Sequence, residues 1–204
     1  MQQGQCDYGR GEKKVEYYDY EKKSRIPYEC PHQALTDKHY CEFHDNEYAQ
    51  NNPDKVMNSF YTLVDYAVQN SEPLSCIGFH LPSKVDLANK EFKDTVYFSF
   101  ATFTEGANFS SSNFKDEVKF DKSRFPSPKT GKDFKDNTIS IKFDYSTFKE
   151  RVQFIGDSNK QPLELGLVSF KGVDLSHIEF HNVGWLQPKR SFFPRYMIIE
   201  SIVG

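Results

Sequence analysis

The sequence of 204 residues has few of the features that mark the commonest functional classes. Hydrophobic residues make up only 37% of it, and no stretch approaches the ~20 consecutive apolar residues of a membrane span, so we expect no membrane contact. Its first residues are polar and lack the apolar core of a signal peptide, so the expected compartment is cytoplasmic. The formal net charge is −3, which favours neither a nucleic-acid binder nor a mimic of a polyanion.

Motifs that carry catalysis are absent from the sequence as well. It has no Gly-rich phosphate loop, no nucleophile elbow and no metalloprotease helix motif. His177 and His181 lie four residues apart in a region with a period of five, so we interpret them as surface imidazoles. The sequence therefore predicts a protein that is not an enzyme.

What the sequence has instead is large apolar residues at regular intervals. The chain has 19 Phe, and seven of them continue from Leu87 in alternating steps of five and six residues: Phe92, Phe98, Phe103, Phe109, Phe114, Phe120 and Phe125. Two residues before each of these stands a residue that is mostly small or β-branched, as at Val85 and Val96, and a mostly polar residue lies between. This inside–outside–inside alternation followed by a turn, repeated, predicts a solenoid.

The pattern is interrupted at residues 126–140 and 155–162 and resumes after each break. It continues at Phe143, Phe148 and Phe154, and then at Leu165, Phe170, Leu175, Phe180 and Trp185. Sixteen inward positions can be counted, and only Lys90 breaks the inward pattern two residues before them. We expect the six-residue steps to form wider corners. An ordinary β-sandwich is the alternative, but it needs longer strands and less regular spacing.

The units Val85-Asp86-Leu87, Ala107-Asn108-Phe109 and Val173-Asp174-Leu175 resemble the Ala-Asp/Asn-Leu/Phe-x-x unit of the pentapeptide-repeat family. The resemblance covers about half the chain. It implies a mainly β fold, a right-handed quadrilateral β-helix with four faces per coil and therefore about four coils. The layout as a whole is similar to that of a group of archaeal pentapeptide-repeat proteins.

Some proteins of this family inhibit topoisomerases by mimicking duplex DNA with acidic faces. Residues 85–185 carry 15 acidic and 14 basic residues, a balance that argues against mimicry.

Residues 1–51 hold three of the four cysteines, at spacings that indicate metal binding more than disulfides. Cys41-x-x-His44 can face one ion from a tight turn, and Cys6 and Cys30 complete a Cys₃His set. Structural zinc is the predicted cofactor, because a segment this polar buries too little apolar surface to order itself. The segment resembles short zinc modules that end in Tyr-Cys-x-x-His, although its interval between the first two cysteines is longer.

Several alternatives to this site stay open. The segment could be an unstructured tail with unrelated thiols, or the zinc could be catalytic, which requires an open coordination position. His32 and His39 are reserve ligands. Cys76 lies apart, in Leu74-Ser75-Cys76-Ile77, and is interpreted as a small buried apolar residue.

Residues 52–76 contain a predicted capping helix and linker. Asn52-Pro53-Asp54 combines an N-cap residue, Pro at the first helical position and an acid in the first turn. The apolar residues that follow share one helical face: Val56, Phe60, Leu63, Val64 and Ala67. The helix is expected to end between Asn70 and Pro73 and to cover the first coil of the repeat region, residues 77–185.

Residues 186–204 leave the repeat pattern, and we expect them to cover the last coil. The stretch from Ile198 to Val203 is an edge strand or the start of a further domain, and the same end could form a homodimer.

The favoured function is a non-catalytic protein-interaction scaffold, with an unknown protein partner bound at the interruptions 126–140 and 155–162. The alternative is association with nucleic acid or the ribosome through the zinc segment and basic residues interleaved with aromatics. The candidate contacts are Lys129, Lys132, Lys135, Lys189, Arg190 and Arg195.

Overall fold

The structure is a computed structural model, and it describes residues 4–10, 14–19, 22, 24–126, 140–157, 162–166 and 168–185. Its elements in chain order are β1 (Val15–Asp19), β2 (Ser24–Tyr28), α1 (Asn46–Asn51), α2 (Pro53–Asn70), β3 (Leu74–Ser75), β4 (His80–Leu81), β5 (Val85–Asp86), β6 (Glu91–Phe92), β7 (Val96–Tyr97), β8 (Thr102–Phe103), β9 (Ala107–Asn108), β10 (Asn113–Phe114), β11 (Val118–Lys119), β12 (Ile141–Lys142), β13 (Thr147–Phe148), β14 (Val152–Ile155), β15 (Leu163–Leu165), β16 (Val168–Ser169), the 3₁₀ helix η1 (Leu175–His177), β17 (Ile178–His181) and β18 (Val183–Trp185).

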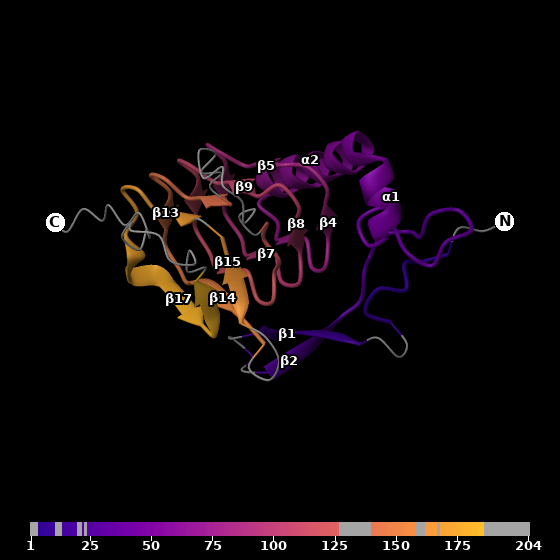
Figure 1. The fold of residues 1–204 in the computed structure, drawn as a ribbon, viewed down its shortest axis with the longest axis horizontal. Helices are drawn as coiled ribbons and strands as arrows, with labels where there is room; N and C mark the ends of the chain where they lie inside the picture. The colour runs from indigo at the N-terminus through magenta and orange to yellow at the C-terminus, as the bar shows by residue number, and fades with distance from the viewer. Residues whose placement is uncertain are drawn as a thin grey trace, which may run out of the picture.

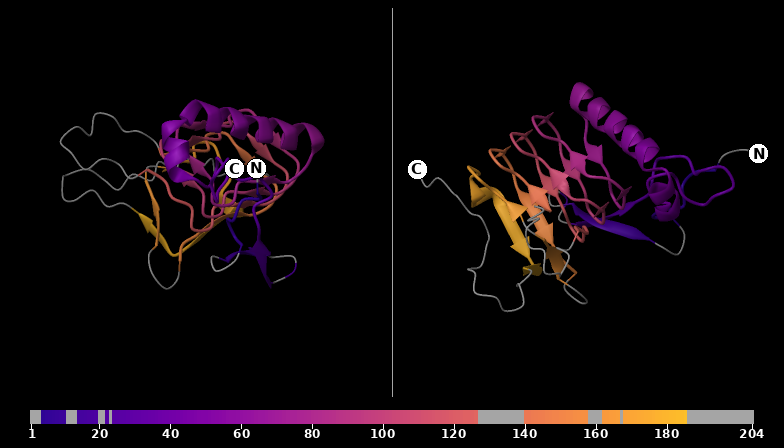
Figure 2. Two further views of the ribbon diagram at one scale, coloured as in Figure 1. Left: turned by 90° about the vertical axis from the view of Figure 1, so that its right-hand side faces the viewer. Right: turned by 45° about the horizontal axis from the view of Figure 1, so that its top comes forward.

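Most of the chain forms a parallel β-solenoid of about four coils, with the helices and the β1–β2 hairpin near its N-terminal end (Figures 1 and 2). In its longest sheet, β3, β7, β11, β14 and β17 lie side by side. Leu74 pairs with Val96, and Val96 with Val118, each 22 residues further along the chain. Two five-residue and two six-residue steps make up this coil, as the sequence spacing predicts. The solenoid begins at β3, three residues before the sequence boundary of 77.

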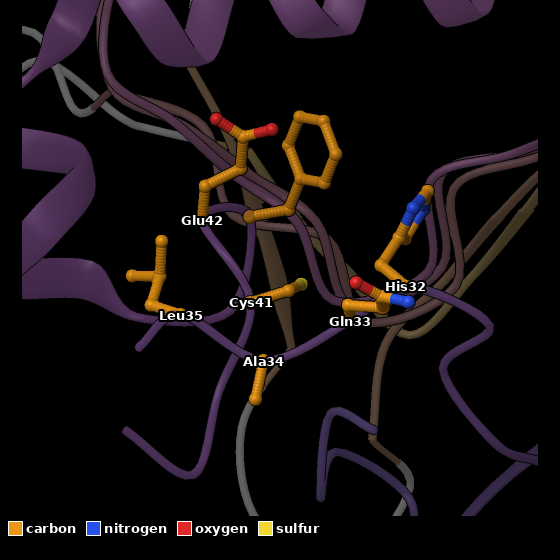
Figure 3. A pocket seen from close by; sticks show the side chains of 7 residues that line it. His32, Gln33, Ala34, Leu35, Cys41 and Glu42 are labelled. Carbon is orange, nitrogen blue, oxygen red and sulfur yellow. The ribbon is translucent and has the colours of Figure 1, made fainter. Parts of the chain in front are cut away.

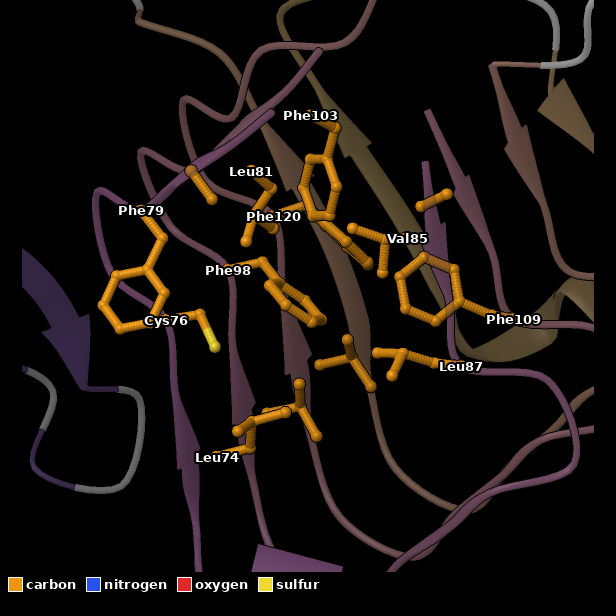
Figure 4. Close-up of a cluster of buried hydrophobic side chains, with 14 of the residues drawn as sticks. Leu74, Cys76, Phe79, Leu81, Val85, Leu87, Phe98, Phe103, Phe109 and Phe120 are labelled. Atoms are coloured by element: carbon orange, nitrogen blue, oxygen red, sulfur yellow. The ribbon is translucent and has the colours of Figure 1, made fainter. Parts of the chain in front are cut away.

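The core of the solenoid consists of columns of aromatic rings from successive coils. Neighbouring rings in a column are nearly parallel, with centroids 4.8–5.4 Å apart, which matches the spacing of adjacent strands. Figure 4 shows the N-terminal part of this core, where inward side chains from different strands converge. The columns are Phe92–Phe114–Phe148, Phe98–Phe120–Phe154–Phe180, Phe103–Phe125 and Phe109–Phe143–Phe170.

Buried serines two residues before the aromatic positions link one coil to the next. The hydroxyl of Ser112 donates to the carbonyl of Leu87 at 2.6 Å, and that of Ser123 donates to the carbonyl of Phe98 at 2.7 Å. A hydroxyl enclosed in an apolar core is costly unless it is hydrogen-bonded, and the preceding coil supplies the acceptor. These polar residues therefore fit the inward pattern.

The corners of the five-residue steps are tight turns. In one of them the amide of Ala101 donates to the carbonyl of Phe98 at 3.0 Å, with Phe100 in the left-handed region at φ +61°. Equivalent residues 11 positions apart share this conformation: Asn89, Ser111 and Lys122 have φ between +53° and +60°. A positive φ at the third residue is the property of a type II turn.

Helix α2 covers one side of the first coils, with Val56, Phe60 and Val64 fully buried. Lys90, the exception to the inward pattern, is explained by this helix: its Nζ lies 2.7 Å from Oδ1 of Asp65 on α2. Since both side chains are partly exposed, the pair contributes at most ~1 kcal/mol. The pair adds a polar contact beside the buried apolar face of α2.

The start of α2 differs from the prediction in one respect. Asn52 is its N-cap residue, but its side chain makes no capping hydrogen bond there. The side-chain amide of Asn52 instead donates to the carbonyl of Tyr48 at 3.1 Å. This bond closes the C-terminus of α1, a short helix that the sequence did not predict. The two helices follow one another directly, so one asparagine serves both ends.

Two further segments depart from the sequence-based expectation. Leu175, counted as an inward strand position, begins the 3₁₀ helix η1. The Tyr- and Lys-rich residues near the N-terminus form the antiparallel β1–β2 hairpin, and its Tyr17 ring packs edge-on against Tyr97 at 5.3 Å between centroids. The expected edge strand near Ile198 lies outside the described residues. Among the described helices, none has both the length and the apolar character needed to cross a membrane.

Candidate metal centre

The four predicted ligands come together at one point. The Sγ atoms of Cys6, Cys30 and Cys41 and a ring nitrogen of His44 all lie within 4.8 Å of one another, and all four residues are buried. The cysteines are free thiols, and Sγ of Cys30 is 3.8 Å from Sγ of Cys41, well beyond the ~2.05 Å of a disulfide. This buried Cys₃His arrangement could bind a metal ion.

The backbone explains how distant cysteines meet. The amide of Cys6 donates to the carbonyl of His32 at 3.0 Å, and the amide of Cys30 donates to that of Tyr8 at 3.1 Å, so two segments far apart in sequence run side by side. The amide of His44 donates to the carbonyl of Cys41 at 3.0 Å and closes the turn that the Cys-x-x-His spacing predicts. The long interval between the first two cysteines is occupied by the β1–β2 hairpin.

His44 uses its two ring nitrogens differently. Its Nδ1 faces the sulfurs, at 3.2 Å from Sγ of Cys41 and 3.5 Å from Sγ of Cys6. Its Nε2 lies 2.9 Å from the carbonyl oxygen of Ile77, in the first coil of the solenoid. A proton on Nε2 donated to that carbonyl leaves Nδ1 free to bind a metal, which is the usual arrangement around a ligating histidine.

Aromatic rings enclose the cluster and join it to the solenoid core. The Tyr8 ring stacks on the His44 ring with centroids 3.8 Å apart and an interplanar angle of 6°. Phe43, which precedes His44 in the chain, stacks on Phe79 of the first coil with centroids 4.2 Å apart and an interplanar angle of 2°. The N-terminal segment is therefore packed onto the end of the solenoid.

The electrostatics of the cluster favour one thiolate beside one imidazolium. The contact with the Cys30 thiol, followed by that with His44, lowers the pKa of Cys41, and the same contact between the two cysteines raises the pKa of Cys30. Burial acts to lower the pKa of His44, but the contacts with Cys41 and Cys6 outweigh it and raise that pKa to about 9. A metal ion bound here would have to displace the proton of the imidazolium, because only the neutral imidazole ligates metals.

The reserve ligands are placed elsewhere. His39 lies on the surface, with Nδ1 3.0 Å from a carboxylate oxygen of Asp7. His32 packs its ring near Phe43 at 5.1 Å, and burial lowers its pKa. Cys76 is fully buried at the first-coil position of the column that continues with Phe98, which agrees with its interpretation as a small apolar residue.

The proposed partner-binding residues cannot be placed. Lys129, Lys132, Lys135, Lys189, Arg190 and Arg195 all lie outside the described residues. Sequence reasoning also missed the parts that Ile77 and Tyr8 play beside His44. No sequence signal marks a backbone carbonyl as a hydrogen-bond acceptor. Tyr8 lies two residues after Cys6, but a tyrosine at that place does not by itself indicate a contact with His44.

Comparison with known proteins returned nothing: no protein-family model, no curated protein and no solved structure matches this chain. The fold and the site thus define the chain as a parallel β-solenoid with a buried Cys₃His cluster at its N-terminal end.

Proposed function

We propose that this protein is a non-catalytic interaction scaffold of the pentapeptide-repeat type, in which a structural zinc ion fixes the N-terminal segment onto a right-handed, quadrilateral β-helix. The observation that carries the proposal is the contact between Nε2 of His44 and the carbonyl of Ile77. It connects the ligand cluster to the first coil, so an ion bound there stabilises the end of the solenoid.

The ligand set and its spacing support zinc. Tetrahedral zinc binds sulfur at about 2.3 Å and nitrogen at about 2.0 Å, which places neighbouring ligand atoms roughly 3.5–3.8 Å apart. The separations of 3.8 Å between Cys30 and Cys41 and of 3.5 Å between Cys6 and His44 agree with this geometry. The 3.2 Å between His44 and Cys41 is shorter, and the four ligand atoms lie within 4.8 Å of one another, so small side-chain shifts would complete the tetrahedron. Zinc would neutralise part of the thiolate charge and hold together a segment with little core of its own.

A structural role fits the site better than a catalytic one. Three sulfurs and one nitrogen fill a tetrahedral shell, so no position is left for a water molecule or a substrate. All four ligand side chains are buried. The further proposal that the protein works in a reducing cytoplasm agrees with the free thiols of the cluster.

The scaffold role is supported by the solenoid surface. Outward residues of successive coils lie in register and hydrogen-bond along the stack, as Asn108 does to Asp86 at 3.0 Å. Such a surface loses little conformational freedom when it binds a partner.

Two measurements test the proposal. Elemental analysis of protein purified without chelator should give one zinc per chain, and a metal content near zero would refute the structural site. Affinity capture from native lysate, with and without nuclease, should recover a protein partner that survives nuclease. If every partner is lost with nuclease, the protein is a nucleic-acid binder.

A further inference from the structure

We propose that the metal module carries a binding pocket for an arginine side chain of a protein partner, with Glu42 as the group that recognises the guanidinium. The inference rests on the proposed scaffold function and names the chemistry that its partner presents. The pocket has a volume of about 290 Å³ and lies between the loop that follows Cys30 and the loop that begins at Cys41 (Figure 3).

The charge of the pocket selects a cation. Its lining includes His32, the thiol of Cys41, which belongs to the Cys₃His cluster, and Glu42, the one carboxylate. The surrounding stretch, residues 32–47, contains four acidic residues and a single lysine. That lysine, Lys38, is already paired with Asp45 at 3.4 Å between Nζ and Oδ2. A phosphate group would meet repulsion here, and a cationic side chain would be attracted.

The remaining walls favour a planar cation. The ring of His32 lines the pocket and packs against the buried ring of Phe43 at 5.1 Å between centroids, so His32 provides an aromatic wall that is held in place. The Gln33 side chain adds an amide oxygen that can accept a further hydrogen bond. A guanidinium can stack on aromatic rings while it donates two parallel hydrogen bonds to one carboxylate, which a lysine ammonium cannot do.

The pocket is formed before any ligand arrives. The amide of Leu35 donates to the carbonyl of Tyr40 at 2.9 Å and closes the loop between the two walls. The amide of Ala34 donates to the carbonyl of Gly4 at 2.8 Å and holds the other side. Since both walls also carry metal ligands, the pocket keeps its shape only while the metal module is folded.

The test is a titration of the metal-loaded, full-length protein, followed by amide chemical shifts. The probes are N-acetyl-arginine amide, the lysine equivalent, the uncharged citrulline equivalent and a short single-stranded oligonucleotide. A single side chain should bind with a Kd of roughly 1–50 mM, and the shifts should cluster at residues 32–35 and 41–43. The Glu42→Gln variant should bind at least about tenfold more weakly, and its control, Glu47→Gln on the exposed face of α1, should bind as the unaltered protein does.

The outcomes separate the possibilities. Three results would overturn the proposal. The arginine amide binds Glu42→Gln as tightly as the unaltered protein, the citrulline probe binds as tightly as the arginine amide, or binding of the arginine amide never saturates. Equal affinity for the lysine amide overturns the choice of a guanidinium, and shifts caused by the oligonucleotide alone assign the pocket to nucleic acid. Zinc content, measured on the same samples, keeps a failure of the proposed structural site distinct from a failure of this pocket.

Discussion

The Nε2 atom of His44 lies 2.9 Å from the carbonyl oxygen of Ile77, while Nδ1 of the same ring lies 3.2 Å from Sγ of Cys41. One imidazole thus bridges the ligand cluster and the first coil of the solenoid. Because the ring is held from both sides, loss of the proposed zinc ion should loosen the end of the solenoid as well as the N-terminal segment.

The first prediction concerns this connection. Cys41→Ala should abolish metal binding and lower the free energy of unfolding by several kcal/mol, because the folded segment depends on its ion. Cys76→Ala is the matched control: this buried cysteine lies outside the cluster, so the variant should keep its metal and lose only ~1 kcal/mol of packing. Elemental analysis and thermal unfolding measure the two effects. Full metal content in Cys41→Ala would contradict the assignment.

The second prediction concerns pH. Burial raises the pKa of Asp121 from 3.8 to about 7. The charges of Lys119 and Lys122 oppose this shift, and that of Glu117 reinforces it. One carboxylate oxygen of Asp121 is enclosed without a hydrogen-bond partner. A folded-state pKa above the unfolded one means that the native state holds the proton more tightly, so stability falls as pH rises from about 4 to 7. Asp121→Asn removes this dependence.

The measurement is urea unfolding of the two proteins between about pH 5 and pH 8. The variant should gain on the order of 2 kcal/mol relative to the unaltered protein over that range. Glu91→Gln, at an exposed outward position of β6, serves as the control and should show a constant difference. A constant difference for Asp121→Asn too would show that the carboxylate is not buried as described.

The third prediction concerns the ring columns. Phe109 is fully buried and stacks on Phe143 at 5.0 Å, so Phe109→Ala should cost about 3–5 kcal/mol through lost contacts and an internal cavity. Tyr145→Ala, at a corner where the ring is 56% exposed, should cost less than about 1 kcal/mol. Equal losses in chemical unfolding would mean that the columns do not carry the stability of the solenoid.

The fourth prediction concerns a glycine at a corner. Gly106 has φ +86°, and a Cβ built on it would lie 2.3 Å from the carbonyl oxygen of Ser140 in the next coil. Gly106→Ala should therefore cost ~2 kcal/mol or more, because both the conformation and the space exclude a side chain. Gly4→Ala, where a Cβ would meet nothing within 4 Å, is the control for thermal unfolding. Equal melting temperatures would contradict the packing described at this corner.

The periodic part of the fold was predictable because each inward position places a side chain in an equivalent buried environment of its coil. Leu87 and the seven Phe that follow it specify the coil length directly, and the 22-residue register confirms it. The Cys₃His cluster was predictable for a related reason: few residue types bind metals, and the turn at Cys41-x-x-His44 is a local one.

The rest depends on contacts that a one-dimensional pattern does not contain. Lys90 interrupts the pattern at a place where its side chain contacts Asp65, which lies 25 residues earlier on α2. Asn52 carried a correct helix-start signal, but the preceding short helix competes for its side chain. The pocket beside Glu42 is formed by two loops whose approach depends on the cysteines, so no single stretch of sequence reveals it.

The 22-residue register has a consequence for how such a chain can change length. Val96 and Val118 occupy equivalent places in successive coils, so excision of residues 96–117 would join Thr95 to Val118 with every inward position still inward. Removal of half that length would bring different columns of rings onto one another. Whole coils are therefore the units in which the distance between the Cys₃His cluster and the far end of the solenoid can be changed without disturbing the register.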